Sequence, residues 1–119
     1  ADGCYINTSG VGAVRHAVSP SRIEPRDAIL ISGELGTHGI AILSVREGIE
    51  FEAPLVSDTA PLWQPVCALL DAGIDVHCLR DLTRGGLSSA LNELAQARGL
   101  SMQVNETAIP VAAPVRGAC

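Results

Sequence analysis

The stretch "RDLTRGGLSSALNE", residues 80–93, places charged side chains beside a glycine pair at the start of a helical pattern. The first N–H groups of a helix lack intrahelical partners, and the helix dipole adds about half a positive charge there. Gly85 and Gly86 let a phosphate approach the backbone closely, while Thr83 and Arg84 add side-chain donors. These residue types therefore predict an anion site, with a phosphate as the expected ligand.

Asp81 lies in the same loop and has two possible roles in such a site. Its carboxylate could orient the donors, or hold a magnesium ion that bridges phosphates. The alternative is a plain strand-to-helix turn, with Asp81 or Thr83 as a helix cap and Arg80 in a surface ion pair. Because the spacing is neither that of a P-loop nor G-x-G-x-x-G, spacing alone favours the plain turn.

A second glycine-bearing loop, "SGELGTHG" at residues 32–39, repeats this arrangement. Gly36, His38 and Gly39 are the candidate residues, and His38 is either a ligand or base, or a polar residue of the first helical turn. His16 and His77 share no metal-ligand spacing with His38 or with any cysteine. This spacing therefore argues against a zinc site, and no metal ligand is assigned from it.

Helices must position both loops, and their apolar spacing and stop signals are readable. The predicted helices cover residues 37–48, 60–73 and 86–99, and "APVRGAC" at the end of the chain starts a fourth. Thr37 is expected to cap the first helix and Asp58 the second, while Gly48, Gly73 and Gly99 end the three helices. The first helix is expected to be largely buried.

Short apolar runs bounded by turn residues predict strands at residues 4–10, 28–33, 74–79 and 101–106. Strands and helices together indicate an α/β, or mixed α and β, fold class. The segment "IEFEAPLVSD" breaks at Pro54 and is the best boundary between two units. We expect residues 1–52 to form the end of an N-terminal sheet-and-helix domain and residues 53–119 to begin a second α/β domain.

Composition restricts the class of protein. Hydrophobic residues make up 47% of the chain and charged residues 18%, which excludes a disordered tail. A net charge of −5 without a basic stripe argues against nucleic-acid binding, and no apolar run approaches the ~20 residues that span a membrane. The four cysteines form no C-x-x-C, and we expect no secretory leader. The expected location is therefore the cytoplasm, with free thiols.

Several motifs occur in a specific order: "YINTSGVG", "ISGELGTHGIAILSVREG", "PLVSD", "LRDLTRGGLSSALNELA", "ETAIPV" and "PVRGAC". Together they closely resemble the HypE family of hydrogenase maturation proteins, within the superfamily of aminoimidazole ribonucleotide synthetase and selenophosphate synthetase. The resemblance runs over essentially all 119 residues and corresponds to the middle of a longer HypE-type chain. The chain is therefore expected to be a fragment.

The resemblance implies an ATP-dependent carbamoyl dehydratase that uses ATP and Mg²⁺ and forms a homodimer through its N-terminal domain. Such enzymes accept a carbamoyl group on a C-terminal cysteine from a partner carbamoyltransferase. They dehydrate the resulting thiocarboxamide to a thiocyanate, the cyanide source for the iron of nickel–iron hydrogenases, and so also meet iron-site assembly partners. The alternatives are a structural or dimerisation module, and a related superfamily kinase that phosphorylates a small metabolite.

The resemblance also carries over to particular residues. The run Asp81, Thr83, Arg84, Gly85 and Gly86 matches the family's signature loop, which faces the nucleotide phosphates in the second domain. Gly36, His38 and Gly39 match the family's G-D-H-G, but Thr37 replaces the usual aspartate. The catalytic and metal-binding residues of the family fall outside these 119 residues, so the fragment alone is expected to be inactive. Two partial domains without their neighbouring strands would leave apolar surface and unpaired sheet edges, so the fragment is also expected to self-associate. Valine in place of Gly86 is expected to crowd the phosphate loop.

Overall fold

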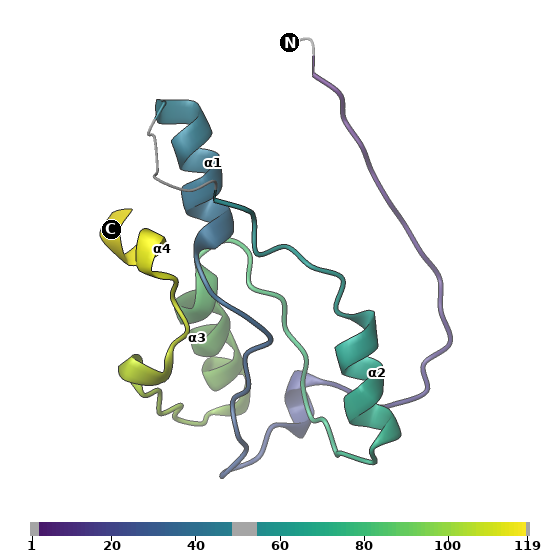
Figure 1. The fold of residues 1–119 in the computed structure, drawn as a ribbon. Helices are drawn as coiled ribbons and strands as arrows, with labels where there is room; N and C mark the ends of the chain where they lie inside the picture. Colours follow the sequence, from purple (N-terminus) through teal and green to yellow (C-terminus); the bar gives the residue numbers. More distant parts are fainter. Residues whose placement is uncertain (1–2, 49–54, 119) are drawn as a thin grey trace.

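The computed structural model describes residues 3–48 and 55–118, in which helices are joined by long extended segments (Figure 1). No helix in these two ranges is long and apolar enough to cross a bilayer. The predicted domain boundary between residues 52 and 53 lies outside the described residues. The helices are, in chain order, η1 (Pro20–Arg22), α1 (Thr37–Glu47), α2 (Trp63–Asp71), α3 (Gly86–Arg98), η2 (Glu106–Ala108) and α4 (Ala113–Ala118).

Glycines set both ends of α1 and of α3. Gly36 and Gly85 precede the two helices, Gly48 and Gly99 follow them, and all four have left-handed backbone angles. Glycine adopts this conformation without the steric cost that a Cβ atom brings. The predicted ends of these helices at Gly48 and Gly99 are therefore confirmed.

Thr37 does not cap α1, contrary to the prediction. Gly36 is the N-cap, and Thr37 is the first helical residue. Its side chain is buried against the body of the protein, and its Oγ1 has no hydrogen-bond partner among the described residues. The expectation of a largely buried α1 is also wrong, because Ile42 and Leu43 are 43% and 42% exposed.

Helix α2 is shorter than the predicted span of residues 60–73, and Asp58 does not cap it. The N-cap is Leu62, which makes no side-chain capping bond. Pro65 lies in the first turn, where its missing N–H leaves no intrahelical bond unmade. Trp63 is 77% exposed, so α2 presents a large aromatic side chain to solvent.

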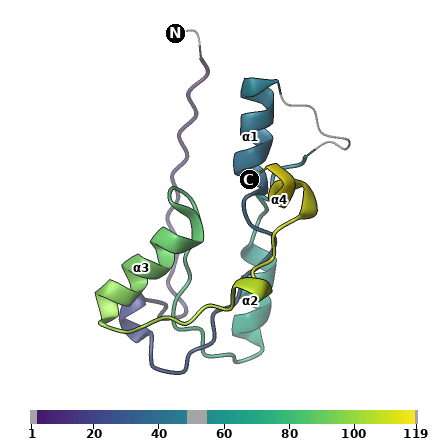
Figure 2. The same cartoon turned by 90° about the vertical axis from the view of Figure 1, so that its left-hand side faces the viewer.

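The buried apolar core is small. Among the described residues only Ile23, Ala90 and Val115 are buried hydrophobic residues. Helix α3 packs on η1, and α1 packs on α4 (Figure 2). The chain exposes 9863 Å², whereas a compact protein of 12.3 kDa exposes about 6,100 Å². Its radius of gyration of 17.0 Å likewise exceeds the ~13.5 Å of a compact domain of this length.

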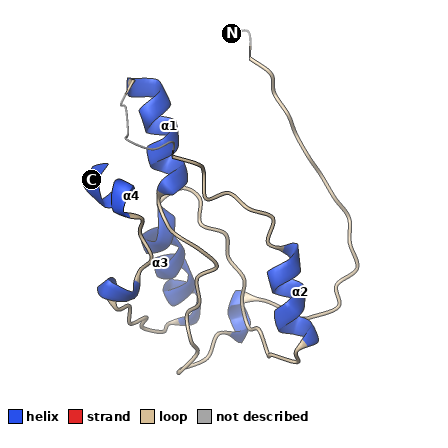
Figure 3. Ribbon diagram, in the orientation of Figure 1, coloured by secondary structure: helices blue, strands red, loops and turns tan. Residues whose placement is uncertain are grey.

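The predicted strands are not formed as strands in residues 3–48 and 55–118 (Figure 3). Residues 4–10, 28–33, 74–79 and 101–106 are extended or irregular, and η2 begins at the last of them. A strand requires a ladder of hydrogen bonds to a neighbouring strand. Here the long-range backbone bonds are isolated, such as Ser19 N–H to the His77 carbonyl (2.8 Å) and Leu35 N–H to the Pro110 carbonyl (2.8 Å). The apolar runs therefore lack paired neighbours among the residues that the structure describes.

Candidate functional site

The start of α3 presents backbone donors without partners. The Gly86 N–H donates to the Thr83 carbonyl (3.0 Å), and the Ser89 N–H donates to the Gly85 carbonyl (3.2 Å). Within the described ranges no backbone carbonyl accepts from the N–H of Leu87 or of Ser88. These two donors lie at the positive end of the helix dipole, where they suit an anion.

The side chains of the same loop are exposed. Asp81, Thr83 and Arg84 make no side-chain hydrogen bond or ion pair with another described residue, and α3 has no side-chain cap. The alternative in which Asp81 or Thr83 caps the helix is therefore wrong. The surface ion pair that the same alternative expected for Arg80 is confirmed, because Arg80 pairs with Glu93 on α3 (2.7 Å). Thr83 and Arg84 remain available to a ligand.

The two glycines of this loop are constrained in different ways. Gly85 has φ +77°, and a Cβ atom there would overlap Ser89 Oγ and lie 2.6 Å from Ser89 Cβ. Gly86 also has a positive φ of 58°, but a Cβ atom there would meet nothing within 4 Å. A Cβ atom at Gly86 thus meets backbone strain alone, whereas one at Gly85 also meets Ser89. The expected crowding of the phosphate loop by valine at Gly86 stays a prediction.

The second candidate loop, at the start of α1, is joined to a distant segment. The Asp58 Oδ1 accepts a hydrogen bond from the His38 N–H (3.2 Å), and His38 Nδ1 lies 2.9 Å from Ser57 Oγ. Ser57 Oγ also lies 2.6 Å from Thr59 Oγ1. Asp58 therefore caps α1 through space, and the "PLVSD" motif meets the G-T-H-G motif that contains Gly36 and Gly39. The His38 side chain pairs with a hydroxyl rather than a carbonyl.

Loss of this cap has a measurable consequence. Asp58→Ala is expected to lower the local stability of α1 by about 1 kcal/mol, because the N–H of His38 loses its acceptor. Hydrogen exchange of the α1 amides measures the change. Asp58→Asn keeps a side-chain oxygen and is the matched control, expected to retain most of the protection. Equal exchange rates in wild type and Asp58→Ala would show that this bond does not support α1.

The N-terminal ends of α1 and α3 lie near each other in two perpendicular views (Figures 1 and 2). Both glycine loops therefore border one region, although Gly39 and Gly85 are 46 positions apart in the sequence. The donors there, which include backbone N–H groups and Arg84, fit the oxygens of a phosphate. The described residues contain no group of three or more His, Cys, Asp or Glu that could hold a metal ion.

A polar network that sequence analysis missed lies at the base of the α3 loop. His77 Nδ1 is 2.8 Å from Asp27 Oδ2, and His77 Nε2 is 3.2 Å from Asp75 Oδ2. Arg22 Nη2 lies 2.6 Å from Asp75 Oδ1, and the Glu24 N–H donates to Asp27 Oδ2 (2.9 Å). The D-x-H spacing of Asp75 and His77 places both side chains on one side of an extended segment, and this spacing was the available signal.

Hydrogen bonding shifts the pKa values in this network. The bond to Asp27, with a second from Asp75, raises the pKa of His77 above its usual 6.5. The pKa of Asp27 is lowered by the Glu24 N–H and by His77, and that of Asp75 by Arg22 and then His77. The charged forms of all three groups are therefore favoured in the folded chain.

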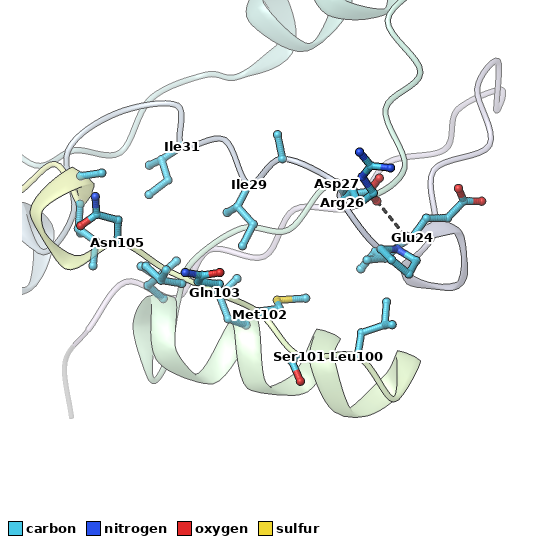
Figure 4. A pocket seen from close by; sticks show the side chains of 18 residues that line it. Glu24, Arg26, Asp27, Ile29, Ile31, Leu100, Ser101, Met102, Gln103 and Asn105 are labelled. Carbon is cyan, nitrogen blue, oxygen red and sulfur yellow. Dashed lines mark hydrogen bonds between the residues drawn. The ribbon is translucent and has the colours of Figure 1, made fainter.

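An open groove of about 690 Å³ separates two extended segments beside α3 (Figure 4). One wall is formed by residues 23–29 with Ile31, and the other by residues 100–105 with Ala108 and Ile109. Leu87 and Leu91 of α3 contribute to the lining. Most of these side chains are apolar, so the groove is suited to an apolar segment rather than to a nucleotide.

The model of the AIR synthase related protein, C-terminal domain, matches residues 24–117. The chain belongs to this family. The matched range includes both glycine loops and, except for Arg22, the network around His77. It also runs across residues 52 and 53, and the division of the chain into two units stays a prediction.

Relatives within the family are HypE proteins. The carbamoyl dehydratase HypE of Azotobacter vinelandii is 51% identical over 120 residues, which cover 99% of this chain and 35% of that protein. A solved HypE–HypF complex matches with a TM-score of 0.79 at 39% identity, covering 86% of this chain and 33% of that chain. Escherichia coli HypE matches with a TM-score of 0.72 at 37% identity, over 87% of this chain and 32% of that chain. The predicted resemblance to HypE is confirmed, and the chain spans about a third of its relatives.

Proposed function

We propose that this chain is part of a carbamoyl dehydratase that acts in nickel–iron hydrogenase maturation. The observation that carries the proposal is 51% identity to a carbamoyl dehydratase HypE over 99% of the chain. The whole enzyme converts an enzyme-bound S-carboxamide to a thiocyanate with ATP and Mg²⁺. It acts in the cytoplasm as a homodimer.

In this proposal the α3 loop forms one wall of the nucleotide site. The free N–H groups of Leu87 and Ser88, with the side chains of Thr83 and Arg84, bind and orient phosphate oxygens. Gly85 keeps the backbone accessible, and Asp81 lies exposed in the same loop. His38 and Gly39, at the start of α1, border the same region. When bound, ATP supplies a phosphoryl group that turns the amide oxygen into a leaving group.

The partners follow from the same assignment. The structure of a HypE–HypF complex supports a carbamoyltransferase partner of the HypF type, because its HypE chain has a TM-score of 0.79 to this chain. That partner delivers the carbamoyl group, and iron-site assembly proteins receive the cyanide. The large exposed apolar surface favours a second candidate function, that of an interaction module without its own chemistry.

We also propose that the whole protein has the predicted α/β fold. In a protein of the relatives' length, residues 28–33 and 101–104 become strands of a sheet whose helices include α3. A strand from the remaining part of that protein lies in the 690 Å³ groove, because both groove walls are extended and residues 28–31 and 101–104 make no backbone–backbone hydrogen bond with another described residue. The relatives are long enough to supply such a strand, because this chain matches only 35% of the Azotobacter vinelandii HypE protein.

The test of function compares the long protein with this chain. We expect the full-length protein to hydrolyse ATP only when its C-terminal cysteine is carbamoylated, and these 119 residues alone neither to bind nor to hydrolyse ATP. Phosphate release and product mass spectrometry measure the reaction. Phosphorylation of a free small metabolite would indicate the related kinases instead. Partner binding without any ATP turnover would support the interaction module.

A further inference from the structure

The two ring nitrogens of His77 both face carboxylates. Nδ1 lies 2.8 Å from Asp27, and Nε2 lies 3.2 Å from Asp75. An ionised carboxylate only accepts hydrogen bonds, and a neutral imidazole donates only one. Both bonds therefore form together only when His77 carries two protons, so the geometry itself selects the imidazolium.

The contacts of His77 join two segments far apart in the sequence. Asp27 belongs to the turn after η1, whereas Asp75 and His77 belong to the extended segment 74–79, which leads into the α3 loop. The His77 carbonyl also accepts from Ser19 N–H (2.8 Å). The same η1 segment holds the far end of α3, because Arg98 Nε donates to the Ile23 carbonyl (2.9 Å). The segments on both sides of the loop are thus anchored to η1.

The charges around His77 favour this arrangement. Two carboxylates, from Asp27 and Asp75, face the ring, and the cation among the contacts of this network is Arg22, which pairs with Asp75 on the side away from the ring. Arg22 also donates to the Val76 carbonyl (3.4 Å) and so ties η1 to the same segment. Loss of the second proton on His77 breaks one of the two bonds, while the contacts of Arg22 stay.

We propose that His77 is a positioning residue whose protonation completes its two hydrogen bonds to Asp27 and Asp75, here called the latch. The latch joins the turn after η1 to segment 74–79 and so orders the base of the α3 loop. Its effect on the nucleotide rests on the proposed function of that loop. Both bonds are present below the usual pKa of His77, 6.5, and one of them is lost as pH rises through the raised pKa in the folded chain. The bonds of Asp27 and Asp75 are present above their usual pKa of 3.8 and are lost as pH falls through the lowered values.

The experiment uses the full-length protein and two histidine variants, His77→Gln and the matched control His16→Gln. His16 is exposed, and no described residue bonds its side chain. Imidazole NMR gives the pKa of His77. Hydrogen exchange at pH 5.5 and pH 8.5, corrected for intrinsic rates, reports the order of residues 17–27 and 74–86. The Michaelis constant for ATP, measured across the same pH range, reports whether the α3 loop is positioned to bind the nucleotide.

In wild type we expect residues 17–27 and 74–79 to exchange about two- to fivefold faster at pH 8.5, the scale of a partly exposed ion pair. His77→Gln should exchange at the faster rate at both pH values, while His16→Gln should behave as wild type. A pKa of His77 at or below 6.5, or exchange that is independent of pH in wild type, would overturn the latch. If hydrogen exchange depends on pH but the Michaelis constant for ATP does not, the positioning role alone would be overturned. Absence of any ATP turnover, with the exchange pattern intact, would instead count against the proposed function.

Discussion

Gly85→Ala is expected to destabilise the start of α3 by about 2–5 kcal/mol and to abolish nucleotide-dependent turnover. About 1–2 kcal/mol of this comes from a Cβ atom on a left-handed backbone. A further ~1–3 kcal/mol comes from overpacking, because the new Cβ overlaps Ser89, 2.6 Å from its Cβ atom. Rotation of the Ser89 hydroxyl cannot relieve that second contact, so the backbone must move. Hydrogen exchange of the α3 amides in the full-length protein measures the loss locally.

Two variants separate strain from overlap at this position. Gly86→Ala meets nothing within 4 Å and should lose only the ~1–2 kcal/mol of backbone strain. The double variant Gly85→Ala/Ser89→Gly removes the overlap. Measured against Ser89→Gly alone, its loss of stability should equal the loss that Gly86→Ala causes in wild type. Equal stability of Gly85→Ala and wild type would show that the loop has another conformation in the full-length protein.

Arg84→Ala is expected to lower kcat/KM for ATP about 10- to 150-fold in the full-length protein. A hydrogen bond from a charged donor contributes about 1.5–3 kcal/mol, and each 1.36 kcal/mol is a factor of ten in rate. Stability should stay unchanged, because Arg84 is exposed and forms no ion pair with the described residues. Steady-state kinetics at several ATP concentrations give the effect.

The matched control for this variant is Arg46→Ala, which removes an equivalent exposed charge from the last turn of α1. It should leave kcat/KM unchanged, and Arg84→Lys should give an intermediate loss because lysine keeps the charge without the planar fork. A drop in kcat/KM with Arg46→Ala equal to that of Arg84→Ala would indicate a general charge effect. Wild-type kinetics in Arg84→Ala would exclude a phosphate contact by this side chain.

The sequence was a reliable guide to the helices and a poor one to the strands. The helices were readable because their stop signals, such as Gly48 and Gly99, and their hydrogen bonds are local. A strand makes its hydrogen bonds with another segment. An apolar run such as residues 28–33 therefore indicates that a pairing strand is needed, but not which segment supplies it. In the described residues that neighbour is absent, and the run lies along an open groove.

By itself, the sequence determined the resemblance to HypE, the ends of α1 and α3, and the glycine loops that carry the candidate site. Tertiary structure alone decided that Asp58 caps α1 rather than α2, that Gly85 rather than Gly86 is sterically closed, and that His77 lies between Asp27 and Asp75. The physical reason is the distance along the sequence over which each interaction acts. Helix signals and glycine angles act within a few residues, whereas a cap or an ion pair between distant residues depends on the path of the whole chain.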